Sequence, residues 1–529
     1  MQRFRGSRVG YFHGLSIGVG AIALLSLGSC DRSAPTRSIE LAQAAVPFGP
    51  VSPTDIPNPA DPAQAARFAW QEFVAVTWPA AVNPDPASSG YFRGQPSPTQ
   101  TSGSTGAGGV TVWETFYHRN ELYPTYATGA GNVLPDPNAA PSYNYGTTKI
   151  TPAPGASLTL FNNTDEASEI NIANMYHTPF AQAADALVKA NPNPGPAVAQ
   201  QILAAQIKAG IVYEAKGNPV IFNYLKSTGF NNVVPRRKAR IQTINKITNL
   251  PVTGATFELP NGSMEIKATW RRYDSSVDNL NSFHWAKLIY YTSDGNGGLI
   301  ASNDTFLLIG LHIIQKTPNV PTFTFATFEH VDNEKTGFRF INDDPQTFTP
   351  PAPPGIRALP DPGIITAVRQ FPIPGAGSAF NLVAFNSAMQ AQLRSMFGTG
   401  NVWANYQLIG VQAVVANDPG GVVPAQQFFL SNFATETNDT LQFFQGGLSG
   451  PNTNVPGPNT AHVFKFDGSK YVAYTAGGCL GCHGSQGQFQ GGDFSVIAAT
   501  GNGFSPEPIK PYPGGPVVLQ NPTGFPLPH

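Results

Sequence analysis

Cys479, Cys482 and His483 form the stretch of the chain whose residue types and spacing indicate a specific chemistry. In this CxxCH pattern, two thiols separated by two residues can add to the vinyl groups of one haem, and the adjacent imidazole can ligate its iron. Gly478 and Gly481 ease the tight turn that attachment needs, because glycine accepts backbone angles that a Cβ forbids. The alternative is a redox or zinc CxxC pair, but a zinc site would need further thiolates or well-spaced histidines. The spacing therefore predicts one covalently attached haem c.

Residues 1–29 are typical of an export signal, with three arginines near the start and an apolar stretch from about residue 15 to 27. The sequence LGSC, which ends at Cys30, resembles the lipobox of bacterial lipoproteins, in which the cysteine is lipidated and becomes the mature N-terminus. An ordinary secretory signal and an uncleaved anchor are the alternatives, although a membrane span needs about 20 apolar residues. We expect a lipid anchor at Cys30 that holds the protein to a membrane.

The three cysteines of the chain are then all assigned, one to lipid and two to haem, so none is left for a disulfide. Both assignments agree on a compartment, because haem is attached covalently on the outer side of the bacterial inner membrane. We therefore expect the protein in the bacterial cell envelope, on the periplasmic side of the inner membrane or at the outer membrane.

The composition describes an ordered, loop-rich protein with a preference for β-structure. Only 12% of the 529 residues are charged, 11% are aromatic, and the chain has 54 glycines and 50 prolines. A net charge of −1 gives no reason to expect nucleic acid as a partner. We predict an α+β fold with a β-rich body (a sandwich or a barrel-like antiparallel sheet), several helices, long Pro/Gly-rich loops and a haem c segment near the C-terminus.

Five regions follow from these patterns. Residues 1–29 are the signal peptide, 30–62 a Pro/Ala-rich tether, 63–344 the mixed helical and β-rich body, 345–378 a Pro-rich linker or crossover, and 379–529 the haem-carrying C-terminal region packed on the body.

Within these regions, the periodicity predicts a buried helix over 63–78, helices between about 179 and 228, and a helix over 379–397. From about residue 238 to 344 we expect mostly strands, and a further strand over 402–415. The expected strands of the body are 264–270, 287–291, 306–314 and 322–331.

The sixth iron ligand is not obvious from the sequence. The segment after His483 contains no methionine, and its only histidine is the last residue, so the pocket must be built largely from upstream residues or the sixth position is open. His312 and His330 are the distal candidates. His312 shares strand parity with Phe306, Leu308 and Ile314, which predicts that it points into an apolar interior. Glu329, His330 and Asp332 could alternatively bind a divalent metal or act as an acid–base group.

Several segments resemble large bacterial single-haem c-type cytochrome lipoproteins of the cytochrome c family. The resemblance implies thioether roles for Cys479 and Cys482 and the proximal-ligand role for His483. The resemblance does not indicate a substrate. The matching segments are WETF from Trp113, MEIKATW from Met264, GLHIIQK from Gly310, ATFEHVDN from Ala326, the CLGCH motif and GDFS from Gly492.

The expected function is electron transfer by a lipid-anchored, single-haem c-type cytochrome, whose partner is a redox protein or a small-molecule donor or acceptor. Carrying one haem does not need so long a chain. The alternatives are therefore a haem enzyme of oxygenase or peroxidase type with an open sixth iron position, and a surface binding protein that uses haem as a sensor or cross-link.

Overall fold

The computed structural model of the chain describes residues 45–333, 339–341, 356–358, 364–367, 373–415, 432, 462–500 and 504–509, with gaps inside these ranges, mainly at 125–132 and between 168 and 194. Residues 1–29, the expected export signal, and Cys30 lie outside the described residues.

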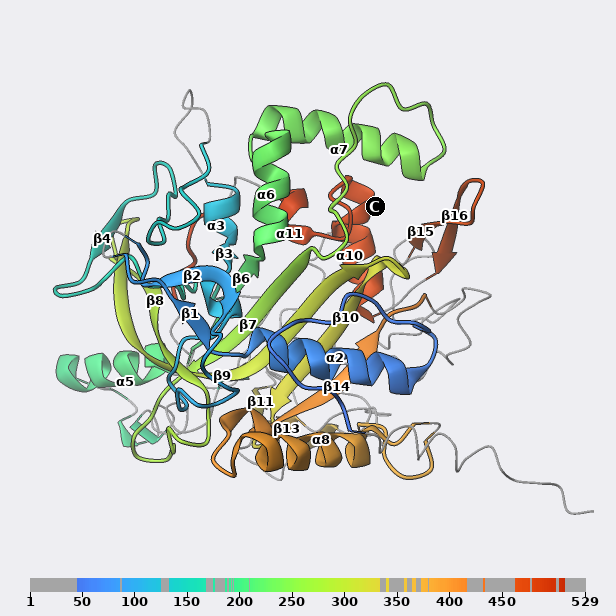
Figure 1. Ribbon diagram of the computed structural model, residues 1–529. Coiled ribbons are helices and arrows are strands. Elements are labelled where there is room, and N and C mark those ends of the chain that lie inside the picture. Colours follow the sequence, from blue (N-terminus) through green and yellow to red (C-terminus); the bar gives the residue numbers. More distant parts are fainter. Residues whose placement is uncertain are drawn as a thin grey trace, which may run out of the picture.

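An eight-stranded sheet forms the centre of the fold (Figure 1). Its strands pair antiparallel, except that β4 runs parallel to β9. The path is β14 (Tyr406–Gln412), β10 (Val320–His330), β9 (Leu299–Thr317), β7 (Met264–Arg272), β6 (Ile211–Gly217) and β3 (Tyr117–His118), with β4 (Ile150–Pro152) and β8 (Trp285–Ser293) also on β9. The first half of β9 pairs with β8 and its second half with β10, so one long strand joins two parts of the sheet. The sheet is open among the described strands, and the expected β-rich α+β fold is confirmed.

One face of the sheet packs against α2 (Pro62–Val76) and α8 (Leu382–Phe397). Helix α2 begins where Asp61 accepts hydrogen bonds from the backbone N–H groups of residues 63 and 64, and Pro62 supplies a preset first position. Its Phe73 stacks on Phe328 of β10 with ring centroids 4.2 Å apart. The indole N–H of Trp70 donates to the Asn386 side chain of α8 over 3.0 Å. This face is the larger apolar core.

The opposite face carries a second apolar cluster, beneath α6 (Pro219–Thr228), α7 (Val233–Ile247), α10 (Gly478–Gln486) and α11 (Val496–Thr500). These four helices gather at the top of the view in Figure 1. Phe222 of α6 stacks on Tyr117 of β3 at 4.0 Å, and Leu480 of α10 is fully buried in the same cluster. The predicted haem segment therefore packs on the body.

The remaining elements are short or peripheral. They are α3 (Arg119–Leu122), α5 (Pro196–Lys208), the hairpins β1 (Ala80–Val82) with β2 (Tyr91–Pro96) and β15 (His462–Phe466) with β16 (Tyr471–Thr475), the 3₁₀ turns Trp113–Thr115, Val402–Asn405 and Gln488–Gln490, and a four-stranded sheet of β12 (Ile356–Ala358), β13 (Ile364–Ala367), β11 (Arg339–Ile341) and β5 (Met175–Tyr176).

The structure differs from the sequence-based expectation in two secondary-structure assignments. Residues 211–217, read as helical, form strand β6 between β7 and β3, whereas α7 occupies the beginning of the region read as strands. The Pro-rich region 345–378, expected as a linker or crossover, contributes strands β12 and β13. In the region assigned as a tether, Val46, Phe48 and Ile56 are buried against the body. No described helix is both long and apolar enough to span a bilayer.

Candidate haem-binding site

The CxxCH residues lie on α10, which begins at Gly478. Positions 479, 482 and 483 are three and four residues apart, so they lie on the same side of the helix. The side chain of Cys479 is partly exposed. Leu480 is buried, and its backbone N–H donates to the Gln412 side chain of β14 over 2.9 Å. The motif is thus held to the sheet by the residue between its two cysteines.

His483 is oriented by one hydrogen bond. Its Nδ1 lies 2.9 Å from the backbone oxygen of Phe494, and because a carbonyl only accepts, Nδ1 carries the proton. Nε2 is then the nitrogen with a lone pair for a metal, the arrangement that metal-ligating histidines typically use. Burial, together with the charge of Lys267, lowers the pKa of His483 to about 4, despite the hydrogen bond to Phe494. The imidazole is therefore neutral at pH 7, as a ligand must be.

Gly487 permits this hydrogen bond. A Cβ at Gly487 would lie 2.6 Å from the backbone oxygen of His483 and 2.8 Å from the backbone carbon of Phe494. Any larger residue would push the two segments apart. On the other side of Phe494, Asp493 has a positive φ of 58°, and its carboxylate accepts from the Lys316 ammonium at 2.6 Å. The carbonyl that orients His483 is therefore held from both sides.

The sheet beneath α10 presents His312. In the register of the sheet, His312 of β9 lies between Thr327 of β10 and Lys267 of β7. Phe325, two residues before Thr327 on the same side of β10, contacts the His483 ring with centroids 4.8 Å apart. Burial, together with the charges of Lys267 and His483, lowers the pKa of His312 to about 3. His312 therefore faces the side of the sheet that carries His483.

A β-bulge determines that side. Trp270 of β7 pairs with Leu308 and Thr269 pairs with Gly310, so Ile309 is an extra residue on β9. Side-chain alternation restarts after the bulge. His312 keeps the predicted side relative to Ile314, but it lies opposite to Phe306 and Leu308, which join the larger core. The predicted parity with Phe306 and Leu308 is therefore wrong, because it assumed a regular strand.

His330, the other distal candidate, lies on the opposite face of β10 from Phe325. Its ring stacks on Phe283 at 3.7 Å, Nε2 lies 2.8 Å from the Ser282 carbonyl oxygen, and Nδ1 accepts from the backbone N–H of Asp332 at 3.2 Å. Both ring nitrogens thus have backbone partners away from α10. Glu329 alternates to the other face, which separates it from His330. Among the described residues, no group of three or more His, Cys, Asp and Glu side chains is placed to hold a metal ion.

Three methionines whose side chains the structure describes do not lie beside α10. Met264 and Met389 are buried in the larger core, on the other face of the sheet, and Met396 is about half exposed. Of the two distal candidates, His312 shares the face of His483 and His330 does not.

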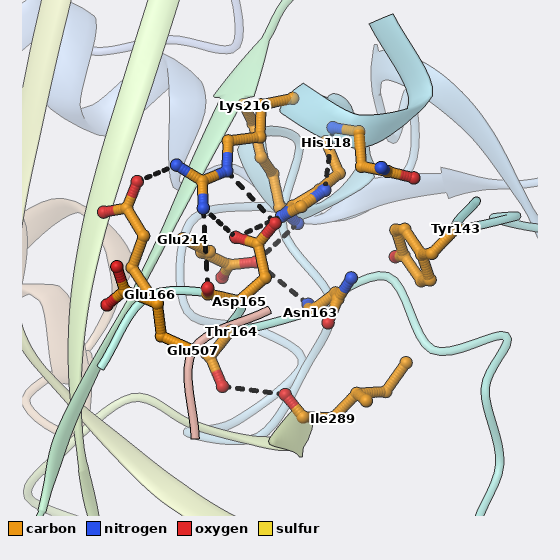
Figure 2. A network of polar contacts seen from close by, with 12 residues as sticks. His118, Tyr143, Asn163, Thr164, Asp165, Glu166, Glu214, Lys216, Ile289 and Glu507 are labelled. Atoms are coloured by element: carbon orange, nitrogen blue, oxygen red, sulfur yellow. Dashed lines mark hydrogen bonds and ion pairs between the residues drawn. The ribbon is translucent and has the colours of Figure 1, made fainter. Parts of the chain in front are cut away.

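A second polar feature, which the sequence analysis missed, lies around β6 and β3 (Figure 2). Asp165 is fully buried, and its carboxylate lies 2.9 Å from the Arg119 guanidinium and 3.3 Å from His118 Nε2. Against the effect of burial, the charges of Arg119 and His118 hold the pKa of Asp165 well below its usual range. Arg119 also pairs with Glu166, whose other carboxylate oxygen lies 3.6 Å from the Lys267 ammonium. The network therefore reaches the residue beside His312.

The network continues through two fully buried residues of β6. Lys216 Nζ lies 3.4 Å from the Glu214 carboxylate and donates to the backbone oxygen of Glu114 and to Asn162. Burial raises the pKa of Glu214 and lowers that of Lys216. The chain after α11 returns here, because the backbone N–H of Glu507 donates to the Asp165 carbonyl at 3.0 Å. Charged residues inside the apolar run IVYEAKG were the one sequence signal for this feature.

The residues present fit a covalently attached haem. The partly exposed Cys479 and the oriented, neutral imidazole of His483 are the donor set that attachment and proximal ligation need, and an apolar ring, Phe325, lies against that imidazole. Comparison of the chain with protein-family models, with curated proteins and with solved structures found no match.

Proposed function

We propose that the chain is a single-haem c-type cytochrome that transfers electrons in the bacterial cell envelope and is anchored to a membrane through lipid at Cys30. The observation that carries the proposal is the orientation of His483 by the Phe494 carbonyl, on the same helix side as Cys479 and Cys482. A CxxC redox pair would have no need for an oriented histidine in the next position.

Each residue has a separate role in this proposal. Cys479 and Cys482 hold the haem through thioether bonds, His483 is the proximal ligand, and His312 is the sixth-ligand candidate. When bound, the haem supplies an iron that alternates between Fe(II) and Fe(III). Histidine on both sides would give a lower reduction potential than a histidine–methionine pair. The partner would be a redox protein or a small-molecule donor or acceptor, and not nucleic acid.

Attachment is tested by producing the full chain in a host that matures c-type cytochromes. Acid–acetone-extracted, denatured protein should retain a pyridine haemochrome band equivalent to one haem per chain. The double variant Cys479→Ser/Cys482→Ser should lose it. If the unsubstituted protein shows no pyridine haemochrome band after extraction, the proposal is wrong.

Anchoring is tested separately. Membrane partitioning should be lost in Cys30→Ser, whereas the haem content should not change. A Cys30→Ser protein that still sediments with membranes would remove the lipid anchor from the proposal without touching the haem.

A haem enzyme with an open sixth position is the second candidate, and a specific arrangement favours it. His312 is flanked across the sheet by Lys267 and Thr327, so polar groups as well as a ligand are available on this face. A six-coordinate, low-spin spectrum that is unaffected by CO, and that becomes high-spin in His312→Ala, supports electron transfer. A high-spin iron that binds CO in the unsubstituted protein supports the enzyme, and then His312→Ala should leave the spin state unchanged.

A further inference from the structure

The outer side of helix α7 combines basic and apolar side chains that are exposed to solvent. Four residues with helical spacing lie along it, namely Val234, Arg237, Lys238 and Ile241. Val234 is 64% exposed and Ile241 is 50% exposed. A single exposed aliphatic residue is ordinary, but here two of them share one helix side with two cations. This grouping is typical of an interaction surface.

The loop after α7 enlarges this surface. Leu250 and Val252 are 56% and 43% exposed. The side chain of Asn245 donates to the backbone oxygen of Pro251 over 3.3 Å, which holds the loop against α7. We call the combined surface the α7 patch, made of Val234, Arg237, Lys238, Ile241, Leu250 and Val252.

Positive charge is concentrated around the α7 patch. Residues 218–257, which cover α6, α7 and the loop, contain six lysines and arginines and no aspartate or glutamate, although the whole chain has a net charge of −1. Arg236 and Arg240 turn back to the body, where they contact the Tyr123 ring and the Gln490 carbonyl. Arg237 and Lys238 form no ion pair with any other residue that the structure describes. These two cations are therefore available to the carboxylates of a partner.

Helix α7 lies directly against the segment that follows the CxxCH helix. Arg240 Nε donates to the backbone oxygen of Gln490 over 2.7 Å. A Cβ at Gly491 would collide with the backbone oxygen of Arg240, so the two backbones meet without room for a side chain. Figure 1 shows α7 above α10 and α11. A protein bound to the α7 patch would thus dock next to the segment that carries the candidate haem site.

The described chain enters the fold on the other side of the molecule. The backbone N–H of Val46 donates to the Gln392 side chain of α8 over 3.0 Å. Helix α8 lies at the bottom of the view in Figure 1 and α7 at the top. Because Cys30 is only 16 residues before Val46, a lipid there would draw the α8 side towards the membrane and leave α7 facing away. This placement favours a protein over the lipid surface as the occupant of the α7 patch.

We propose that the α7 patch docks an acidic redox protein, whose carboxylates meet Arg237 and Lys238 and whose apolar surface covers the four aliphatic side chains. The inference rests on the proposed electron-transfer function, for which it supplies the contact surface and the charge of the partner. Opposite charges steer the encounter and fix its orientation. The complex should be weak, because redox partners meet through small interfaces, below about 1,200 Å², and must separate after each transfer.

The test measures the fluorescence anisotropy of a labelled 2Fe–2S ferredoxin, a small acidic redox protein, as the purified full chain is added. The basic mitochondrial cytochrome c is the control probe. We expect a Kd for ferredoxin on the order of 10 µM at 10 mM salt and no saturable binding of cytochrome c. The Kd should rise at least about tenfold at 100 mM salt, because the screening length falls from about 30 to about 10 Å. No saturable binding of ferredoxin at 10 mM salt would overturn the proposal.

Charge reversals locate the binding surface. Arg237→Glu/Lys238→Glu should weaken ferredoxin binding at least about tenfold. The matched control is Lys149→Glu/Lys287→Glu, which makes the same change in net charge through two exposed lysines beside β4 and on β8, away from α7 in Figure 1. The control should change the Kd less than about twofold. Equal weakening by the two double variants would mean that only overall charge matters, and the α7 patch would not be the docking surface.

The apolar part of the α7 patch has its own test. Ile241→Ser removes apolar contact area and should weaken ferredoxin binding about fivefold, because the side chain is half exposed in the free protein and covered in the complex. Unchanged affinity in Ile241→Ser would refute the proposed apolar contact.

Vesicles of phosphatidylglycerol and phosphatidylcholine in equal amounts test the lipid surface as occupant. Sedimentation of the full chain carrying Cys30→Ser with these vesicles, lost on addition of Arg237→Glu/Lys238→Glu, would assign the α7 patch to lipid and overturn the proposal. We expect no such sedimentation.

Binding of ferredoxin does not require haem, so its outcome is independent of the haemochrome test of the proposed function. In haem-loaded protein, one electron should pass from the reduced cluster of ferredoxin to Fe(III), which stopped-flow absorbance follows. Its second-order rate constant should fall in Arg237→Glu/Lys238→Glu by about the same factor as the affinity. A rate constant that does not change would show that electrons do not enter through the α7 patch.

Discussion

Glu265→Gln is expected to remove the loss of folding stability that ionisation of the buried Glu265 carboxyl causes as pH rises. Glu265 of β7 is 5% exposed and faces the haem segment. Burial, together with the charge of Asp493 and against a hydrogen bond with Ser495, raises its pKa to about 7. The folded state therefore holds the proton more tightly than the unfolded chain does. Unfolding becomes easier as pH rises from about 4.5 to about 7, and the full loss is present above pH 7.

The magnitude follows from the two pKa values. A carboxyl that titrates near 4.5 when unfolded and near 7 when folded loses about 3 kcal/mol of stability once it is ionised in both states. Between pH 5 and pH 8, the free energy of unfolding of the unsubstituted protein should fall by about 2 to 3 kcal/mol relative to that of Glu265→Gln. Urea unfolding at both pH values measures this difference.

Glu258 serves as a control, because its effect on stability changes with pH in the opposite direction to that of Glu265. Despite partial burial, its hydrogen bond with Lys246 lowers the pKa of Glu258, so the stabilisation from this group is present at neutral pH and is lost on acidification. Glu258→Gln should therefore lose more stability at pH 8 than in acid, and the change should be small because the pair is solvent-exposed. If Glu265→Gln and the unsubstituted protein showed the same pH dependence, Glu265 would not be a buried neutral acid.

Two further substitutions test the candidate site and the buried network. Gly487→Ala should separate His483 from the Phe494 carbonyl and shift the absorption spectrum of the haem-loaded protein, whereas Gly400→Ala, where a Cβ meets nothing within 4 Å, should leave the spectrum unchanged. An unaltered spectrum in Gly487→Ala would show that the hydrogen bond does not position the ligand. Arg119→Met should cost about 3 to 5 kcal/mol in urea unfolding, because it leaves a buried carboxylate without its guanidinium. The exposed Arg237→Met should cost less than about 0.5 kcal/mol, and comparable losses in the two variants would argue against the network.

The sequence patterns correctly predicted the helices and strands whose own residues strongly favour that secondary structure. The spacing of the apolar residues identifies α2, and runs of β-branched and aromatic residues identify β7 to β10. Strand β6 was missed because its neighbourhood is rich in alanine and glutamine, which favour a helix. Pairing with β7, and with β3 at one end, overrides that preference.

The buried network was hidden for a different reason. Its members come from α3, β6 and the segment around Asp165, which are separated by tens of residues in the chain. Only the fold brings Arg119 and Lys216 next to carboxylates. Charged residues in a strand are ordinarily read as a solvent-facing side, so the sequence alone favours exposure at positions where the structure buries ion pairs.

The proximal and distal halves of the candidate haem site differ in the same way. The proximal half is local, since Cys479, Cys482 and His483 fall on one helix side by spacing alone. The distal half depends on Ile309, because one extra residue on β9 moves every later side chain to the other face. Without that bulge, His312 would point with Phe306 and Leu308 into the larger core, away from α10. A distal ligand on this strand is thus specified by a pairing irregularity, which the sequence of β9 does not reveal without its partner β7.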